Sequence, residues 1–256
     1  MRVQILGAHN TESRSTRLAA VLVDGRLALD AGGLTSSLSF RAQIKVRAVL
    51  LTHQHYDHIR DIPALAMNAY LRETAFSVYS TLPVFETLAG HFLNGTTYPK
   101  FYEKPPEKPA IDYHVIEAGR SFTALGYDVT AISVPHSVPA VGYQVTPPEG
   151  GALFYAGDTG PGLAGCWADV SPRALIIEVT APDRFEDFAV EAKHLTPGLL
   201  GRELEEFRRL KGYLPAVVAT HLNPAQEDEI KGQLARVAAA LGADILPGRE
   251  GLRLDL

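Results

Sequence analysis

The chain has 256 residues with a formal net charge of −5, and 46% of its residues are hydrophobic. These values are typical of one soluble globular domain, residues 1–256, and they exclude a broad basic surface for nucleic acid. The single cysteine excludes an intrachain disulfide, and no apolar run is long enough to cross a membrane, so we expect a cytoplasmic protein with no membrane association.

The N-terminal residues predict antiparallel strands rather than a signal peptide. Val3 and Ile5 alternate with polar neighbours, and the apolar runs 18–23 and 27–30 flank Asp24-Gly25, which is a strong hairpin signal. Asp30 ends the second run. Two interpretations of its carboxylate stay open, namely a turn cap or a support beneath a functional site.

The next segments alternate between strand and helix. Residues 46–51 predict a buried strand, and apolar residues at helical spacing over 59–69 predict a helix after it. Residues 76–79 predict a further strand, and 83–92 a helix that begins at a proline.

The stretch 94–112 differs from both patterns because it is rich in proline and aromatic residues. Proline disfavours regular structure, and long loops within compact domains are often functional. A substrate lid, an oligomer arm and an ordered surface loop all remain open for this segment.

The second half of the chain begins with strands and continues with strands and helices. We expect strands at 113–117, 121–125, 129–134, 141–145, 153–156, 174–179, 216–220, near 245 and at 252–254, with helices at 197–210 and 225–241. Each half thus runs from strands into helices. This order predicts an α/β fold of two mixed sheets packed face to face with helices outside.

The residues with the clearest chemistry lie at the end of the 46–51 strand. Within Thr52–His58 stand four possible metal ligands, His53, His55, Asp57 and His58, in a chain that contains only 9 histidines. More candidates follow later strands, namely His136, Asp158 and His221. Because α/β folds place chemistry at strand ends, these side chains are candidates for one shared site.

His194 precedes a predicted helix rather than following a strand. Thr196 is a good N-cap and Pro197 suits the first helical position. An imidazolium beside this helix start would favour an anion, as a phosphate clamp or as an acid for a leaving group. The alternative is a histidine that only holds its own loop.

These motifs resemble those of the metallo-β-lactamase superfamily, over nearly the whole chain. The resemblance implies a four-layer αβ/βα sandwich with two divalent metal ions. One ion would be bound by His53, His55 and His136, and the other by Asp57, His58 and His221, with Asp158 between them and Asp30 supporting the ligands. Zinc is the first choice for this donor set, with manganese or iron as alternatives.

The segments around His136, His194 and His221 resemble class II-like cyclic-nucleotide phosphodiesterases and, more distantly, the tRNA 3′-endonucleases of the ribonuclease Z branch. The resemblance implies hydrolysis of a small phosphodiester by a metal-bridging hydroxide, with Asp57 and His194 as catalytic residues and Thr196 near the substrate. A tRNA 3′-endonuclease and a catalytically weak metal sensor are the alternatives. A homodimer is also open.

Overall fold

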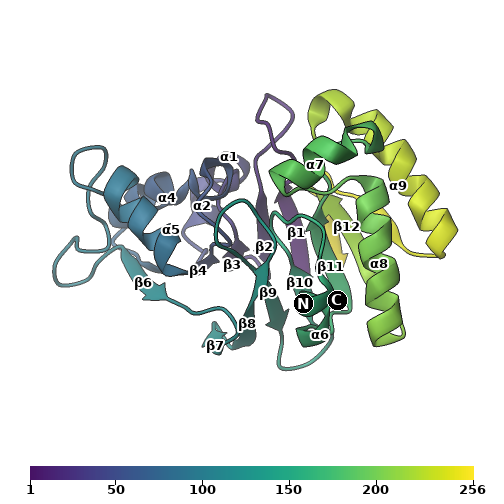
Figure 1. Cartoon of the computed structure of the whole chain (residues 1–256). Helices are drawn as coiled ribbons and strands as arrows, with labels where there is room; N and C mark the ends of the chain where they lie inside the picture. The colour runs from purple at the N-terminus through teal and green to yellow at the C-terminus, as the bar shows by residue number, and fades with distance from the viewer.

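The computed structural model describes residues 1–256 and consists of two seven-stranded β-sheets packed face to face (Figure 1). The first sheet has the order β14-β1-β2-β3-β4-β5-β6 and the second the order β13-β12-β11-β10-β9-β8-β7. The first sheet's strands are β1 (Arg2–Gly7), β2 (Ala20–Val23), β3 (Leu27–Leu29), β4 (Ala48–Leu50), β5 (Phe76–Ser80), β6 (Ile111–Val115) and β14 (Arg253–Asp255). The second sheet's strands are β7 (Ser121–Ala124), β8 (Tyr127–Val134), β9 (Ala140–Thr146), β10 (Leu153–Tyr155), β11 (Ala174–Glu178), β12 (Ala216–Thr220) and β13 (Ile245–Pro247).

Both sheets are mixed in the same way. In each sheet three neighbouring pairs of strands are antiparallel and three are parallel. In the first sheet β3, β4, β5 and β6 are parallel neighbours. In the second sheet β10 to β13 are parallel, and β8 runs in the same direction because both β8 and β10 are antiparallel to β9. The carboxyl ends of these strands therefore meet at one edge of each sheet, where the site lies.

Helices cover the outer faces of both sheets (Figure 1). Those of the first half are α1 (Leu34–Ser37), α2 (Phe40–Gln43), α3 (Tyr56–Ile59), α4 (Ile62–Tyr70), α5 (Leu82–Thr87) and the π-helical turn η1 (Leu88–Phe92). Those of the second half are α6 (Ala164–Asp169), η2 (Asp183–Phe185), α7 (Glu186–Ala192), α8 (Pro197–Lys211), η3 (Pro224–Gln226) and α9 (Glu227–Leu241). The longest, α8 and α9, have 15 residues each, and no helix combines the length and apolarity that a membrane crossing needs.

Three hydrophobic layers hold the four structural layers together. One layer lies between the two sheets, and the other two lie between each sheet and its helices. Strand β11 shows why, since Leu175 and Ile177 pack toward the helices while Ile176 packs toward the other sheet. Alternate residues of a strand face opposite sides, so a fully apolar strand serves two cores. The expected αβ/βα sandwich is confirmed.

Several element boundaries differ from those expected from sequence. The short helices α1, α2, α6 and α7 were not expected, because helices of four to seven residues are stabilised by tertiary packing rather than by their own periodicity. The expected helix 83–92 changes to a π-helical turn at Leu88. The strand expected at 113–117 instead spans Ile111–Val115, so the last residues of the expected 94–112 loop belong to β6.

The proline-rich loop is anchored by its aromatic residues. Phe101 is buried in the core between the first sheet and its helices, and Tyr98 and Tyr102 pack against the same core. The rings of Tyr98 and Phe101 meet edge to face with centroids 5.9 Å apart. This packing accounts for the aromatic content of the segment and favours the ordered-loop interpretation.

Candidate metal centre

The histidine-rich segment connects β4 to α3. The side chains of His53 and His58 are buried, whereas those of His55 and Asp57 are half-buried. The short helix α3 begins at Tyr56, which brings His58 back beneath His53, with ring centroids 4.2 Å apart. The turn from strand to helix therefore gathers four donor side chains at one point.

The other sheet supplies the remaining candidates from three strand ends. His136 follows β8, Asp158 follows β10 and His221 follows β12. Between β10 and Asp158 lies Gly157, with φ of +62°, and a Cβ there would stand 2.9 Å from Thr52 Cγ2. Only glycine allows this close approach between the two sheets. The meeting of the two halves of the site therefore depends on glycine at position 157.

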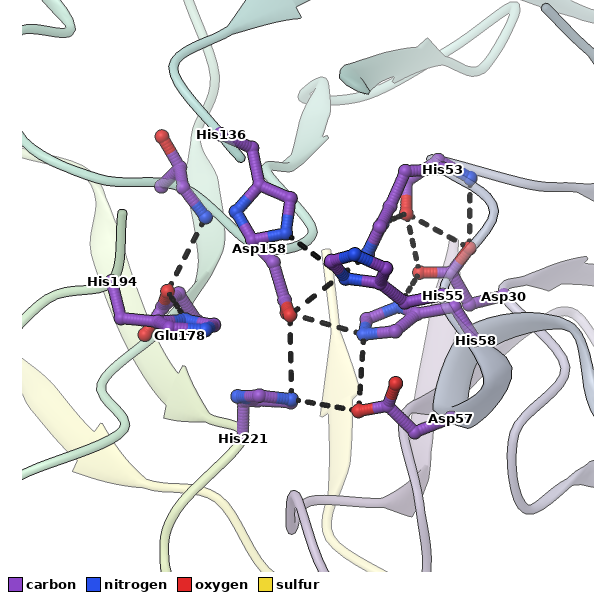
Figure 2. A network of polar contacts seen from close by, with 12 residues as sticks. Asp30, His53, His55, Asp57, His58, His136, Asp158, Glu178, His194 and His221 are labelled. Atoms are coloured by element: carbon purple, nitrogen blue, oxygen red, sulfur yellow. Dashed lines mark hydrogen bonds and ion pairs between the residues drawn. The ribbon is translucent and has the colours of Figure 1, made fainter. Parts of the chain in front are cut away.

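All seven side chains that the sequence singled out as metal ligands converge (Figure 2). They form two groups whose candidate ligand atoms lie within 4.8 Å of one another, and Asp158 belongs to both. The first group is His53, His55, His136 and Asp158, and the second is Asp57, His58, Asp158 and His221. This is the same division that the resemblance implied.

Distances place the Asp158 carboxylate at the centre of both groups. Its Oδ1 lies 3.2 Å from His58 Nε2, and its Oδ2 lies 3.4 Å from His221 Nε2 and 3.9 Å from His53 Nε2. Burial alone would raise the pKa of this carboxyl, but the surrounding histidine charges hold the pKa well below its usual range. Asp158 is therefore an anion between two sets of nitrogen donors.

The donor set fits divalent cations. The buried nitrogens His53 Nε2 and His58 Nε2 make no hydrogen bond of acceptable geometry with any protein group. A buried polar atom without a partner is costly, so it calls for a ligand. Burial also lowers the pKa values of His53, His55 and His136, which keeps these imidazoles neutral as metal binding requires.

Asp30 lies beneath His58 rather than acting as a turn cap. Its Oδ2 accepts hydrogen bonds from His58 Nδ1 at 2.7 Å and from the Tyr155 hydroxyl at 2.8 Å, while Thr52 N donates to Oδ1 at 2.8 Å. Asp30 has φ of +57°, an unusual conformation for a residue other than glycine. These contacts fix the ring of His58 and leave its Nε2 facing Asp158, as in other metal sites whose histidine carries a carboxylate partner.

His221 is oriented in a similar way. Its Nδ1 lies 2.8 Å from the Thr180 hydroxyl, and its Nε2 lies 3.1 Å from Asp57 Oδ2. His221 also has a positive φ, +61°, so both halves of the site contain a strained backbone position. Burial opposes ionisation of Asp57, but the contact with His221 holds the pKa of this carboxyl below its usual range.

His194 lies beside the cluster, with its ring centroid 5.3 Å from that of His136 and 5.5 Å from that of His221. Its Nδ1 lies 2.5 Å from Glu178 Oε1, and Glu178 is buried at the end of β11. Burial opposes the charge on His194, but the Glu178 carboxylate raises the pKa of the ring to about 9. Thr196 is buried and serves as the N-cap of α8, with its hydroxyl accepting from Leu199 N.

Glu178 and Thr180 are site residues that the sequence analysis missed. Glu178 ends the apolar strand Ala174–Glu178, so it carried the same strand-end signal as Asp158 and His221. Glutamate differs from the other candidates of this site, which are all histidine or aspartate. Glu178, His194 and His221 form a third group of possible donors, but His194 and Glu178 already satisfy each other at 2.5 Å.

A four-layer sandwich with a His/Asp cluster at the shared strand edge defines a class of metallohydrolase. Residues 28–226 match the family model described as a β-lactamase superfamily domain. The chain belongs to the metallo-β-lactamase superfamily.

Two curated relatives are similar to part of this chain. Ribonuclease Z from Thermococcus kodakarensis is 30% identical over 144 residues, which are 54% of this chain and 43% of that protein. Ribonuclease Z from Pyrococcus abyssi is 30% identical over 143 residues, 54% of this chain and 44% of that protein. The match thus spans less than half the length of either relative.

Solved structures share the fold over the full chain. Unliganded yeast PDE1 superposes with a TM-score of 0.84 at 15% identity, covering 100% of this chain and 99% of that one. YhfI from Bacillus subtilis gives 0.78 at 17% identity, with 99% of each chain covered. The short form of human tRNase Z gives 0.70 at 19% identity, covering 100% and 99%.

Proposed function

We propose that this protein is a phosphodiesterase that hydrolyses small phosphodiesters, with 3′,5′-cyclic nucleotides as the first candidates. The observation that carries the proposal is the Glu178–His194 pair beside the two metal-ligand groups. A charged imidazole next to residues that would hold two divalent cations suits an anionic substrate with a poor leaving group. The likeness to yeast PDE1 and to ribonuclease Z supports phosphodiesters as the substrate class.

The two metal ions would be held by the groups that share Asp158, with zinc first and manganese or iron as alternatives. Thiolate ligation is not part of this site, because Cys166, the only cysteine, is buried in the core beside α8. When bound, divalent cations act as Lewis acids on phosphoryl oxygens and lower the pKa of water.

His194 lies where it can donate a proton to the leaving group. Its Nδ1 is held by Glu178, so the opposite ring nitrogen, Nε2, remains for the substrate. As the oxygen of water bonds to phosphorus and the ester P–O bond breaks, His194 donates its proton to the departing alkoxide oxygen. The Glu178 carboxylate raises the pKa of His194, which favours a proton on the ring at neutral pH.

Asp57 is the second catalytic candidate. Its Oδ2 contacts His221 Nε2 at 3.1 Å, and Oδ1 accepts no hydrogen bond from the protein. Oδ1 is therefore the oxygen of this carboxylate that is free to accept a proton from the attacking water. Asp57 and His194 thus divide the proton transfers of a hydrolysis between them.

A tRNA 3′-processing endonuclease is the second candidate, and the ribonuclease Z relatives support it equally well. Binding of tRNA depends on many phosphate contacts from lysine and arginine. The chain has 24 basic and 29 acidic residues, which is our reason for placing small substrates first.

The test is a substrate panel on metal-loaded protein: cyclic nucleotides, a chromogenic phosphodiester, unprocessed tRNA, a β-lactam and a lactone. We expect turnover of the cyclic nucleotides and the chromogenic ester. Cleavage of tRNA alone would favour the endonuclease, and turnover of the lactam or lactone alone would contradict the proposal. Two bound metals without hydrolysis of any ester would favour a sensor.

A further inference from the structure

Tyr56 is an exposed aromatic residue within the metal-binding segment. It lies between His55 and Asp57, one candidate ligand from each metal group, and 59% of its side chain is exposed. Consecutive Cα atoms are about 3.8 Å apart, so the ring begins within one residue of both groups. No core packing accounts for an aromatic residue here.

A second aromatic residue, distant in sequence, lies against Tyr56. The ring of Phe92 is 6.4 Å from that of Tyr56, centroid to centroid, with 26° between the planes, which is an offset stack. Phe92 is half-buried and packs against the core between the first sheet and its helices, so its ring has a fixed position. Together the two rings make an aromatic surface next to the segment that carries His55 and Asp57.

The π-helical turn η1 determines where Phe92 points. Leu93 N donates to Leu88 O at 2.7 Å, and both leucines are buried, so the wide turn is anchored at both ends. A π-helical turn rotates the following side chains relative to an α-helix, and such turns are frequent at functional sites. The expected α-helix over 83–92 would have directed Phe92 differently.

A second exposed tyrosine that contacts a phenylalanine ring has a structural explanation. Tyr70, at the end of α4, is 43% exposed, and its ring lies 5.5 Å from that of Phe101. Phe101 is fully buried, so Tyr70 covers a core residue of the proline-rich loop. Tyr56 instead lies next in sequence to two candidate ligands, His55 and Asp57. This contrast makes Tyr70 a matched control.

We propose that Tyr56 and Phe92 form a platform on which the nucleobase of a cyclic nucleotide stacks while its phosphate lies at the metal cluster. This inference rests on the proposed function and adds to it the residues that recognise the base. Every base has an aromatic face, so stacking selects for a base without choosing among the four. The site then discriminates nucleotides from other phosphodiesters by the base and not by the phosphate.

The test compares two cyclic esters on metal-loaded full-length protein, 3′,5′-cyclic AMP and methyl riboside 3′,5′-cyclic phosphate, which lacks the base. The measured quantity is the ratio of kcat/KM for the two esters. Tyr56→Leu and Phe92→Leu should each lower this ratio about tenfold, mainly through KM for cyclic AMP. Tyr56→Trp should preserve the ratio, and so should the control Tyr70→Leu.

If the ratio of kcat/KM is unchanged in Tyr56→Leu and Phe92→Leu and metal content is intact, the platform proposal is wrong. The proposed phosphodiesterase activity would not be contradicted by that result. If Tyr56→Leu loses metal or fails to fold, Phe92→Leu decides, because Phe92 has no candidate ligand as a neighbour.

A binding measurement separates failure of the platform from failure of the proposed function. If the unmodified protein hydrolyses neither ester, the proposed function fails, and calorimetric titration with AMP and ribose 5-phosphate tests the platform alone. A preference for AMP that falls about tenfold in both leucine variants supports the platform. Equal affinity for the two ligands overturns it.

Discussion

His194 Nδ1 donates to Glu178 Oε1 at 2.5 Å, and the other oxygen of the same carboxylate is also engaged. Oε2 accepts from the Thr180 hydroxyl at 2.9 Å and from Leu195 N at 3.2 Å. The carboxylate is thus held in place from several sides, which fixes both the orientation and the charge of the imidazole. Because Thr180 also contacts His221, the pair is joined to the metal-ligand groups through one hydroxyl.

His194→Ala should retain both metals and lose about 100-fold or more in kcat, since the proton donor to the leaving group is absent. Metal analysis and steady-state kinetics on the chromogenic phosphodiester check this. A fall in metal content would show instead that His194 is a ligand.

Glu178→Gln should reduce kcat less than His194→Ala does, because the imidazole remains. Without the carboxylate, which raises the pKa of His194, this pKa should fall, so the alkaline limb of the pH–rate profile should move to lower pH. A profile identical to that of the unmodified protein would contradict a role for Glu178 in the charge of His194.

Asp57→Ala should empty the second metal position preferentially, because Asp57 belongs only to the group with His58 and His221. The reciprocal variant His55→Ala should empty the first. Native mass spectrometry counts the bound ions at increasing metal concentration. Equal loss at both positions in either variant would be inconsistent with this division.

Tyr155→Phe should weaken metal binding about tenfold, because it removes a hydrogen bond to the Asp30 oxygen that orients His58. Tyr143→Phe is the matched control, since its buried hydroxyl donates to Leu51 O at 2.8 Å and makes no hydrogen bond to Asp30. Both variants should lose about 1 kcal/mol of unfolding free energy. Only Tyr155→Phe should shift the metal titration, and an equal shift in both would remove the specific role of Tyr155.

His9 should make stability depend on pH. Its Nδ1 lies 2.7 Å from Glu250 Oε1, and although burial opposes the charge, Glu250 raises the pKa of His9 above its usual 6.5. A histidine whose pKa is raised on folding contributes its full stabilisation below its unfolded-state pKa, about 6.5. This contribution is lost as pH rises through its folded-state pKa. His9→Gln should therefore be less stable than the unmodified protein by about 1 kcal/mol at pH 6.

Urea unfolding of both metal-loaded proteins at pH 6 and pH 10 measures this difference. The difference in unfolding free energy between His9→Gln and the unmodified protein should be smaller at pH 10 than at pH 6. His114→Gln is a suitable control, because His114 is an exposed histidine that pairs with Asp112 at 2.8 Å. A gap that stays constant from pH 6 to pH 10 would argue against the charge on His9.

Much of the fold could be expected from local patterns. The Asp24-Gly25 turn does join β2 to β3, and the residues expected to follow strands do follow β8, β10 and β12. Patterns of this kind act over a few residues, so they are visible without the rest of the chain. Sequence patterns did not predict helices α1, α2, α6 and α7, because packing, not periodicity, stabilises them.

The sequence by itself determined which chemical groups this protein can use, because the identity of the donor side chains at strand ends does not depend on how the chain folds. Only the tertiary structure decided which of them meet. It joined Asp30 to Tyr155, Glu178 to His194 and Tyr56 to Phe92, pairs that lie far apart in the chain or had no reason to be linked. Asp30 and Tyr155 come from different sheets, whereas each of the other two pairs joins elements within one half of the chain. Hydrogen bonds and ring stacking act over a few ångströms, so such pairs exist only once the chain has folded and brought its distant segments together.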